Sequence, residues 1–167
     1  PSGKLSETYP LNLDDTPSRY NFPGTLLSVE YRESIFIGYR YYDKTEKEVL
    51  FPFGFGLSYT TFEYSDIKLS SKSIKDTDTV TVSFKVKNTG KRDGAEVAQV
   101  YVASPESKVF KASKELKGFK KVFIEPGMQI TVEFTLGYEE LKVWTVNEKF
   151  ELESCAVELF AGSNPNL

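Results

Sequence analysis

The sequence of 167 residues contains no histidine, and this absence removes several kinds of active site. Serine or cysteine nucleophiles activated by histidine, histidine general bases and histidine-ligated zinc or iron sites all need a residue that the chain lacks. There is one cysteine, Cys155, so no internal disulfide can form. The chain must therefore fold on packing alone.

Long apolar runs and a basic excess are also missing. No apolar run reaches bilayer-spanning length and no charged segment followed by an apolar one opens the sequence, so we expect neither a transmembrane segment nor a signal peptide. The net charge is -3, and the lysines at 117–121 fit the solvated side of a strand better than a phosphate-binding face. Neither nucleic acid nor membrane is expected as a partner, and the cellular compartment stays open.

The part of the chain from about Thr61 onward has the pattern of a β-protein. Apolar and polar residues alternate at 79–87 and 130–136, which predicts two half-buried strands, and the more apolar stretch 95–102 predicts a central one. Further strands are expected at 62–69, 116–124, 141–146 with an extension toward 152, and 157–161. About seven such strands predict an all-β fold, a two-sheet sandwich of immunoglobulin or fibronectin type III topology.

Turn-forming residues separate these strands. Asn88-Thr89-Gly90 and Asp93-Gly94 supply residues that tolerate positive φ. Glu125-Pro126-Gly127 places proline before glycine, as a type II turn requires.

Residues 1–60 differ in kind from the rest. Their hydrophobic periodicity is poor, and prolines recur at Pro1, Pro10, Pro17, Pro23 and Pro52. Because proline removes backbone donors, we expect an irregular amino-terminal arm that must lie on another surface to bury its aromatic side chains. The chain thus divides into an arm, residues 1–60, and a sandwich domain, residues 61–167.

The aromatic side chains of the arm allow two interpretations. They are Tyr20, Phe22, Tyr31, Phe36, Tyr39, Tyr41, Tyr42, Phe51, Phe53 and Phe55. We favour packing under the sandwich and against other domains, because aromatic rings supply large buried area, over stacking on sugar rings as in a carbohydrate-binding module. Within the same region, we expect Arg40 with Asp43 and Arg32 with Glu33 to form buried or interface ion pairs that orient the arm, in preference to contacts with a substrate.

Carboxylates are the remaining candidates for acid and base catalysis. The candidate pairs are Asp14/Asp15, Asp76/Asp78, Glu139/Glu140 and Glu151/Glu153. Adjacent residues on an extended chain point apart, and the others occupy polar turns, so the burial needed to tune a pKa is not evident. We therefore assign no catalytic, cofactor-binding or metal-binding residue and expect no cofactor.

Several motifs, taken in order, carry a resemblance to a known family. They are Gly3-Lys4-Leu5-Ser6-Glu7-Thr8-Tyr9-Pro10, Tyr39-Arg40-Tyr41-Tyr42-Asp43, Phe51-Pro52-Phe53-Gly54-Phe55-Gly56-Leu57-Ser58-Tyr59-Thr60, the segment 88–102 and the segment 114–122. Over nearly the whole chain this order resembles the carboxy-terminal region of family 3 glycoside hydrolases, the β-glucosidase-like enzymes. The resemblance implies a fibronectin type III-like sandwich preceded by a segment that closes the second catalytic domain.

The resemblance also implies where the chemistry takes place. Such enzymes hydrolyse terminal β-linked glucose or a related sugar with retention, using an Asp of the amino-terminal barrel and a Glu that precedes the region matched here. Neither position is present in this chain. Trp144 is similar to an aromatic position of the late hairpin, a core or edge residue. Two segments depart from the family pattern: Glu153-Ser154-Cys155 replaces Glu-Pro-Gly, where Cys155 would be strained by positive φ, and residues 162–167 replace a terminus with Arg-Asp.

The combined expectation is a non-catalytic, carboxy-terminal stabilising module of a β-glucosidase-like glycoside hydrolase. A free-standing structural or carbohydrate-binding sandwich is the alternative. The expected partners are the remaining catalytic domains of such an enzyme and, for the isolated chain, a second copy through the aromatic arm. Tyr41, Tyr42, Phe53 and Phe55 are the residues expected to be exposed for that contact. Sugar specificity stays open.

Overall fold

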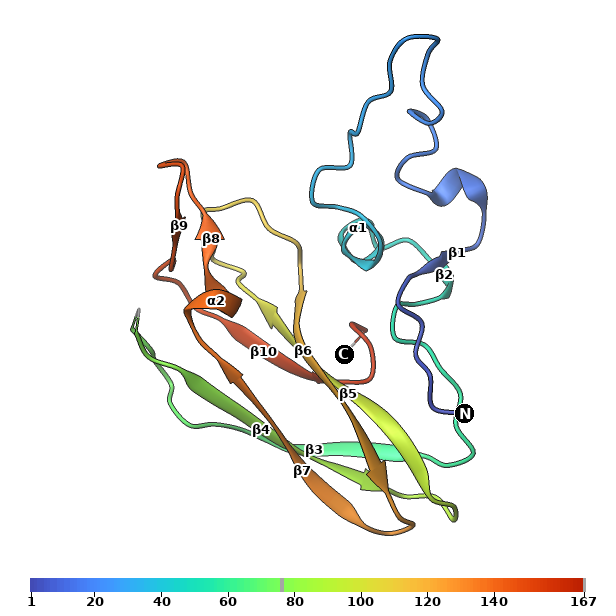
Figure 1. The fold of residues 1–167 in the computed structure, drawn as a ribbon, viewed down its shortest axis with the longest axis vertical. Coiled ribbons are helices and arrows are strands. Elements are labelled where there is room, and N and C mark those ends of the chain that lie inside the picture. The colour runs from blue at the N-terminus through green and yellow to red at the C-terminus, as the bar shows by residue number, and fades with distance from the viewer. Residues whose placement is uncertain (76, 167) are drawn as a thin grey trace.

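The computed structural model describes residues 1–75 and 77–166, and shows a β-sandwich with an arm beside it (Figure 1). The sandwich strands are β3 (Phe62–Leu69), β4 (Val80–Asn88), β5 (Gly94–Ala103), β6 (Glu115–Ile124), β7 (Gln129–Leu136) and β10 (Glu158–Gly162). The arm contains β1 (Tyr9–Pro10), the 3-10 helix η1 (Leu13–Asp15), helix α1 (Tyr39–Thr45) and β2 (Val49–Phe51). Between β7 and β10 lie helix α2 (Tyr138–Leu141), β8 (Val143–Trp144) and β9 (Phe150–Glu151).

Two antiparallel three-stranded sheets form the layers of the sandwich. One has the order β3-β4-β7 and the other β10-β5-β6, while β1-β2 and β8-β9 are separate two-stranded pairs. The register between β4 and β7 places Phe84 opposite Val132 and Val82 opposite Phe134, so the predicted apolar faces of both strands point to the same side. The all-β sandwich prediction is therefore confirmed.

The core lies between the two sheets. Its buried members are the inward residues of four strands: Val80, Val82, Phe84, Val86, Ala98, Val100, Val102, Val122, Ile124, Val132 and Leu136. The ring of Phe84 stacks on that of Phe134 at a centroid distance of 6.0 Å, but Phe134 is only half-buried, whereas Phe84 is 2% exposed. The alternation at 79–87 thus places apolar side chains inward, as predicted.

The turns were predicted with partial success. Gly127 has φ of 74°, as a type II turn at Glu125-Pro126-Gly127 requires. Gly90 and Gly94 do not adopt positive φ, so the predicted reason for these glycines is wrong. A Cβ at Gly90 would lie 2.2 Å from Oγ1 of Thr60, and a Cβ at Gly94 would lie 2.7 Å from Cγ2 of Thr60. These two glycines therefore allow the end of the arm to approach the sandwich closely.

The segment predicted as a strand from 141 toward 152 is instead a helical turn followed by a hairpin. The N–H of Gly137 donates to Oε2 of Glu140 at 2.9 Å, which supports the start of α2. The N–H of Thr145 donates to the carbonyl of Lys149 at 3.0 Å, and Glu148 turns the chain with φ of 57°. A strand that reaches Trp144 is therefore reversed within a few residues. In the segment Glu153-Ser154-Cys155, which departs from the family pattern, Cys155 does not have positive φ, so the strain predicted at this residue is absent.

The arm is less irregular than predicted, because residues 39–45 form a helix. Tyr39 and Tyr42 are three residues apart, so they share one face of α1, and both are buried. Tyr39 contacts Tyr101 on the outer face of β5 edge-to-face at 6.1 Å, and its hydroxyl oxygen accepts the N–H of Leu116 at 2.9 Å. Tyr101 is 0% exposed. The base of the arm thus covers the outer face of the β10-β5-β6 sheet around Tyr101.

The alternation along β4 makes a stability prediction. Phe84→Ala should lower the free energy of unfolding by about 3–5 kcal/mol, because it leaves a cavity between the sheets. Phe134→Ala should cost less, since the side chain of Phe134 is only partly buried. Lys85→Ala should cost less than about 1 kcal/mol, because it removes only a surface ion pair to Asp66. Urea denaturation gives all three values, and equal effects at Phe84 and Lys85 would contradict the register.

Candidate functional site

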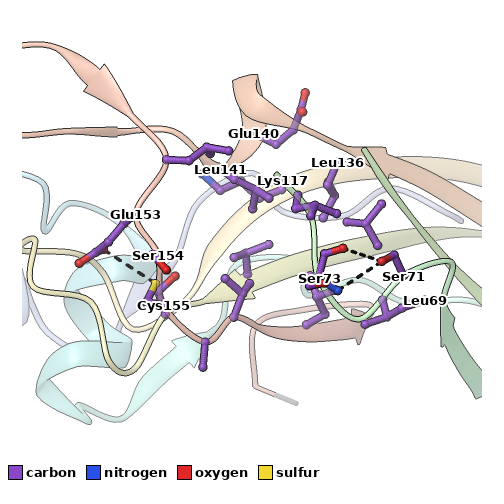
Figure 2. A pocket seen from close by; sticks show the side chains of 18 of the residues that line it. Leu69, Ser71, Ser73, Lys117, Leu136, Glu140, Leu141, Glu153, Ser154 and Cys155 are labelled. Atoms are coloured by element: carbon purple, nitrogen blue, oxygen red, sulfur yellow. Dashed lines mark hydrogen bonds between the residues drawn. The ribbon is translucent and has the colours of Figure 1, made fainter. Parts of the chain in front are cut away.

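One hollow of the molecule is lined by residues of both sheets and of the segments 71–75 and 152–157. It has a volume of about 720 Å³, with an apolar floor that includes Val80, Leu136 and Leu159. Its rim carries polar side chains from several segments, among them Glu140, Glu153 and Cys155 (Figure 2). Figure 2 shows Glu140 beside Leu141 on one wall, and Glu153 with Cys155 on another.

The carboxylates on this rim are engaged in local structural contacts. Glu140 accepts the backbone N–H of Gly137, and Glu153 accepts the hydroxyl of Ser107 and the N–H of Lys108 at 2.6 Å. The hydrogen bond from Ser107 first, and that from Lys108 second, lower the pKa of Glu153. Cys155 Sγ lies 3.9 Å from Oε2 of the same carboxylate. Glu153 therefore serves as a tether between two loops.

The other predicted candidate carboxylates also contact nearby groups. Asp14 pairs with Arg19, Asp15 with Lys47 at 3.3 Å, and Glu139 with Lys142 at 2.6 Å. The pKa of Glu151 is lowered, mainly by its hydrogen bond with Lys149. Asp78 accepts the N–H of Lys75 at 2.9 Å, and Asp76 lies outside the described residues. A catalytic general acid requires a raised pKa, whereas the pKa of Glu151 is lowered.

The predicted ion pairs of the arm do not form. Among the described residues Arg40 and Asp43 make no salt bridge, and Arg32 pairs with Glu30 instead of Glu33. The guanidinium of Arg40 lies over the ring of Tyr39, 5.6 Å from its centroid. Residues at i and i+3 on a helix can meet, but here the packing of Tyr39 on the sandwich directs Arg40 elsewhere.

Asp43 faces a second pocket, of about 510 Å³, between α1 and the segments at 113–114 and 165–166. Burial raises the pKa of Asp43, and the positive charge of Lys114 opposes this effect. One oxygen of Asp43 is buried without a hydrogen-bond partner. Three further buried polar atoms lack one among the described residues, and all lie in the arm: Oγ1 of Thr8, Oε2 of Glu33 and Nε of Arg40. A buried polar atom without a hydrogen bond is costly. Among the described residues, the buried side-chain polar atoms without a partner all lie in the arm, and none lies in the sandwich.

The apolar side chains of the arm divide into a covered set and an exposed set. Tyr42 is buried and Tyr41, Phe53 and Phe55 are half-buried, so the prediction that these four are the exposed residues is wrong. Phe53 packs on Tyr39 at 5.0 Å, which explains its burial. Exposed apolar residues occur along much of the arm, and one group of them lies between 20 and 37: Tyr20, Phe22, Leu26, Leu27, Val29, Tyr31, Ile35 and Ile37. We call this set the arm surface.

One buried contact between arm and sandwich was missed by sequence reasoning. Lys4 Nζ lies 3.1 Å from Oε1 of Glu96, and both side chains are largely buried. The hydroxyl of Tyr64 donates to the same oxygen at 3.1 Å. The only sequence signal was an acidic residue at an inward position of a strand, and its partner is far away along the chain. The contact fixes the amino-terminal segment to the sandwich.

Within residues 1–75 and 77–166, no group of three or more cysteine, aspartate and glutamate side chains is arranged to hold a metal ion. A bilayer-spanning helix is not found in the part of the chain that the structure describes, because none of its helices has the required apolar length.

Comparison with known proteins gives consistent matches. The fibronectin type III-like domain model matches residues 96–164. Thermostable beta-glucosidase B of Acetivibrio thermocellus is 56% identical over 136 residues, which is 81% of this chain and 18% of that protein. The crystal structure of a GH3 beta-glucosidase from Bifidobacterium adolescentis superposes with a TM-score of 0.92 at 39% identity, over 99% of this chain and 24% of that one. A beta-glucosidase from Kluyveromyces marxianus has a TM-score of 0.90 at 42% identity, with 99% and 20% covered.

The matched region includes the arm as well as the sandwich, because the structural matches cover 99% of the chain. The chain spans about a fifth of the length of the curated relatives it matches.

The tether formed by Glu153 makes a prediction about pH. Its pKa is lower in the folded chain than in the unfolded one, so the tether stabilises the fold above the unfolded pKa of about 4.3 and is lost as pH falls through the folded pKa. Glu153→Gln should therefore lower Tm at pH 7, and the gap to the unmodified chain should close below about pH 4.

Thermal unfolding by circular dichroism across this pH range checks the tether. Glu63→Gln is the matched control, because Glu63 is exposed and makes no side-chain hydrogen bond or ion pair among the described residues. A gap that stays constant with pH would show that the carboxylate charge of Glu153 does not matter.

Proposed function

Because the chain matches the carboxy-terminal, fibronectin type III-like region of family 3 glycoside hydrolases of the β-glucosidase type, we propose that it is the non-catalytic module that stabilises the catalytic domains of such an enzyme. One observation carries the proposal: the arm presents a group of exposed apolar side chains at 20–37, and the buried side-chain polar atoms that lack partners among the described residues also lie in the arm. A covering domain would remove the exposed apolar side chains from water.

The proposed parent enzyme hydrolyses terminal β-glucosidic bonds with retention, and its two carboxylates lie outside this chain. The pKa values of Glu151 and Glu153 support this division, because both are lowered by local hydrogen bonds. A catalytic acid needs a raised pKa, and a nucleophile needs a substrate pocket in front of it. Asp43 has a raised pKa, but its cause is burial against the sandwich beneath α1.

The arm surface supports the proposed position of the catalytic domains. Leu26 and Leu27 are fully exposed, and Tyr31 nearly so. An apolar set of this size on a single segment is typical of an interface. Its base cannot move freely, because Tyr39, Phe53 and Lys4 fix the arm to the sandwich. The arm therefore presents a preformed surface to its partner.

The isolated chain should not hydrolyse an aryl β-glucoside above the buffer rate. Any residual rate should be unchanged in the double variant Glu139→Gln/Glu140→Gln, because both carboxylates have structural partners. Activity that purifies with the chain and disappears in this variant would contradict the proposal.

A hybrid enzyme tests the stabilising role in the same assay. The matched region of the Acetivibrio thermocellus relative is replaced by the corresponding part of this chain, and the relative lacking that region is the control. The hybrid should be active and should have a higher Tm than the truncated control. Equal Tm and activity in the two proteins would refute stabilisation by this module.

The arm surface also makes a prediction for the isolated chain. It should bind a hydrophobic dye or self-associate, because Leu26 and Leu27 have no cover. Leu26→Ser/Leu27→Ser should reduce dye fluorescence and dimerisation, whereas Tyr42→Ser should instead destabilise the fold, since Tyr42 is buried. Sedimentation velocity and dye titration measure this. A monomer without dye signal in every form would refute the arm surface as an interface.

Binding to glucan is the outcome that would favour the alternative function. The exposed rings of Tyr20, Phe22 and Tyr31 are the residues that would stack on sugars. Retention of the isolated chain on insoluble β-glucan, lost on substitution of these rings, would support a carbohydrate-binding module in place of a stabilising one.

A further inference from the structure

The β8–β9 hairpin extends from the same end of the sandwich as the arm (Figure 1). Val146 in its turn is 99% exposed, and Trp144 and Phe150 are each about half exposed. The two aromatic rings meet edge-to-face at 5.0 Å, and the ammonium of Lys142 lies 4.7 Å from the centroid of Phe150. The hairpin is therefore a packed apolar projection.

The polar groups of the hairpin are satisfied internally. The N–H of Thr145 donates to the carbonyl of Lys149 at 3.0 Å, and its hydroxyl donates to Glu151 at 2.8 Å. Glu151 also pairs with Lys149 at 2.6 Å. A partner that meets the tip at Val146 would thus be recognised by apolar contact, without demand for new hydrogen bonds.

A chain of contacts connects the hairpin to the arm. Glu153, which follows β9, accepts hydrogen bonds from Ser107 and Lys108 in the loop between β5 and β6. In the same loop, the ring of Phe110 meets that of Phe36 in the arm at 4.9 Å, edge-to-face. The hairpin, the β5–β6 loop and the arm therefore form one continuous end of the molecule.

We infer that the tip of the hairpin, Trp144 and Val146, is a second docking point for the same catalytic domains that cover the arm surface. This inference rests on the proposed function. The occupant is specified by the relatives, in which about four-fifths of the polypeptide lies outside the matched region. Phe110 joins the β5–β6 loop to Phe36 in the arm, and Glu153 ties the same loop to the segment after β9, so a domain seated on the arm lies next to the loop that holds the hairpin.

The test uses the hybrid enzyme described above. Val146→Asp should lower the Tm of the hybrid by at least about 2 °C, because it places a charge in an apolar contact. The same change should leave the Tm of the isolated chain unaltered, since Val146 is already in water there. Met128→Asp is the matched control: Met128 is also exposed, but it lies in the β6–β7 turn at the opposite end of β7 from the hairpin. Met128→Asp should leave the Tm of both the hybrid and the isolated chain unchanged.

The outcomes separate the docking point from the proposed function. If Leu26→Asp lowers the Tm of the hybrid but Val146→Asp does not, the hairpin contact is refuted and the stabilising module stands. If the unmodified hybrid is no more stable than the truncated relative, both are refuted.

Trp144 is the only tryptophan of the chain, so tryptophan emission, excited selectively over that of the tyrosines, reports on the hairpin of the isolated protein. The intensity and wavelength of the Trp144 emission should not change when cello-oligosaccharides are added. Saturable quenching or a blue shift by these sugars would overturn the inference in favour of a sugar-binding hairpin.

Discussion

The burial of Tyr39 against Tyr101 is the contact on which the shape of the molecule depends. It places α1 on the outer face of β5, where a sheet residue would otherwise meet water, and the Tyr39 hydroxyl satisfies the N–H of Leu116. Gln99 completes the site: its side-chain oxygen accepts the hydroxyl of Tyr101, and its Nε2 donates to the carbonyl of Ser163 at 2.9 Å. Three segments distant in sequence are thereby joined on one face of one sheet. The base of the arm is as ordered as a core, although it lies outside the sandwich.

The sandwich and the arm differ in how well their buried polar atoms are hydrogen-bonded. In the sandwich, even the buried amide of Asn88 is fully used: it donates to the carbonyls of Arg92 and Ile124 and accepts from Thr60 and Gly90. In the arm, by contrast, exposed apolar side chains and buried polar atoms without partners occur together. Neither deficit arises from poor anchoring, because Tyr39 and Lys4 hold the arm on both sides. An ordered segment with such deficits has the character of half an interface.

The sandwich could be predicted from sequence because its information is local. Alternation at period two, as in Val82, Phe84 and Val86, specifies which face of a strand is buried without knowledge of its neighbours. Helix α1 was not predicted, because seven residues are too few to show a helical period. The only sign of it in the sequence was the spacing of three residues between Tyr39 and Tyr42. Pairs such as Lys4 with Glu96 depend on the tertiary fold. The exposed part of the arm was misplaced for the same reason: aromatic content marks residues able to bury area, but only the packing of Phe53 on Tyr39 shows which of them do so.

The acidic residues of the chain follow the same division. Glu153 and Glu151 have lowered pKa values because each accepts hydrogen bonds that hold the end with the hairpin together. Asp43 has a raised pKa because α1 buries it at the joint between arm and sandwich, with Lys114 offsetting part of the effect. The two carboxylates that hold this end together are thus stabilised as anions, whereas Asp43, which is disfavoured as an anion, lies where the arm meets the sandwich. A raised pKa is often taken to mark catalysis. Here the cause of the raised pKa of Asp43 is its burial, which follows from the position of α1 on the sandwich and not from a catalytic site.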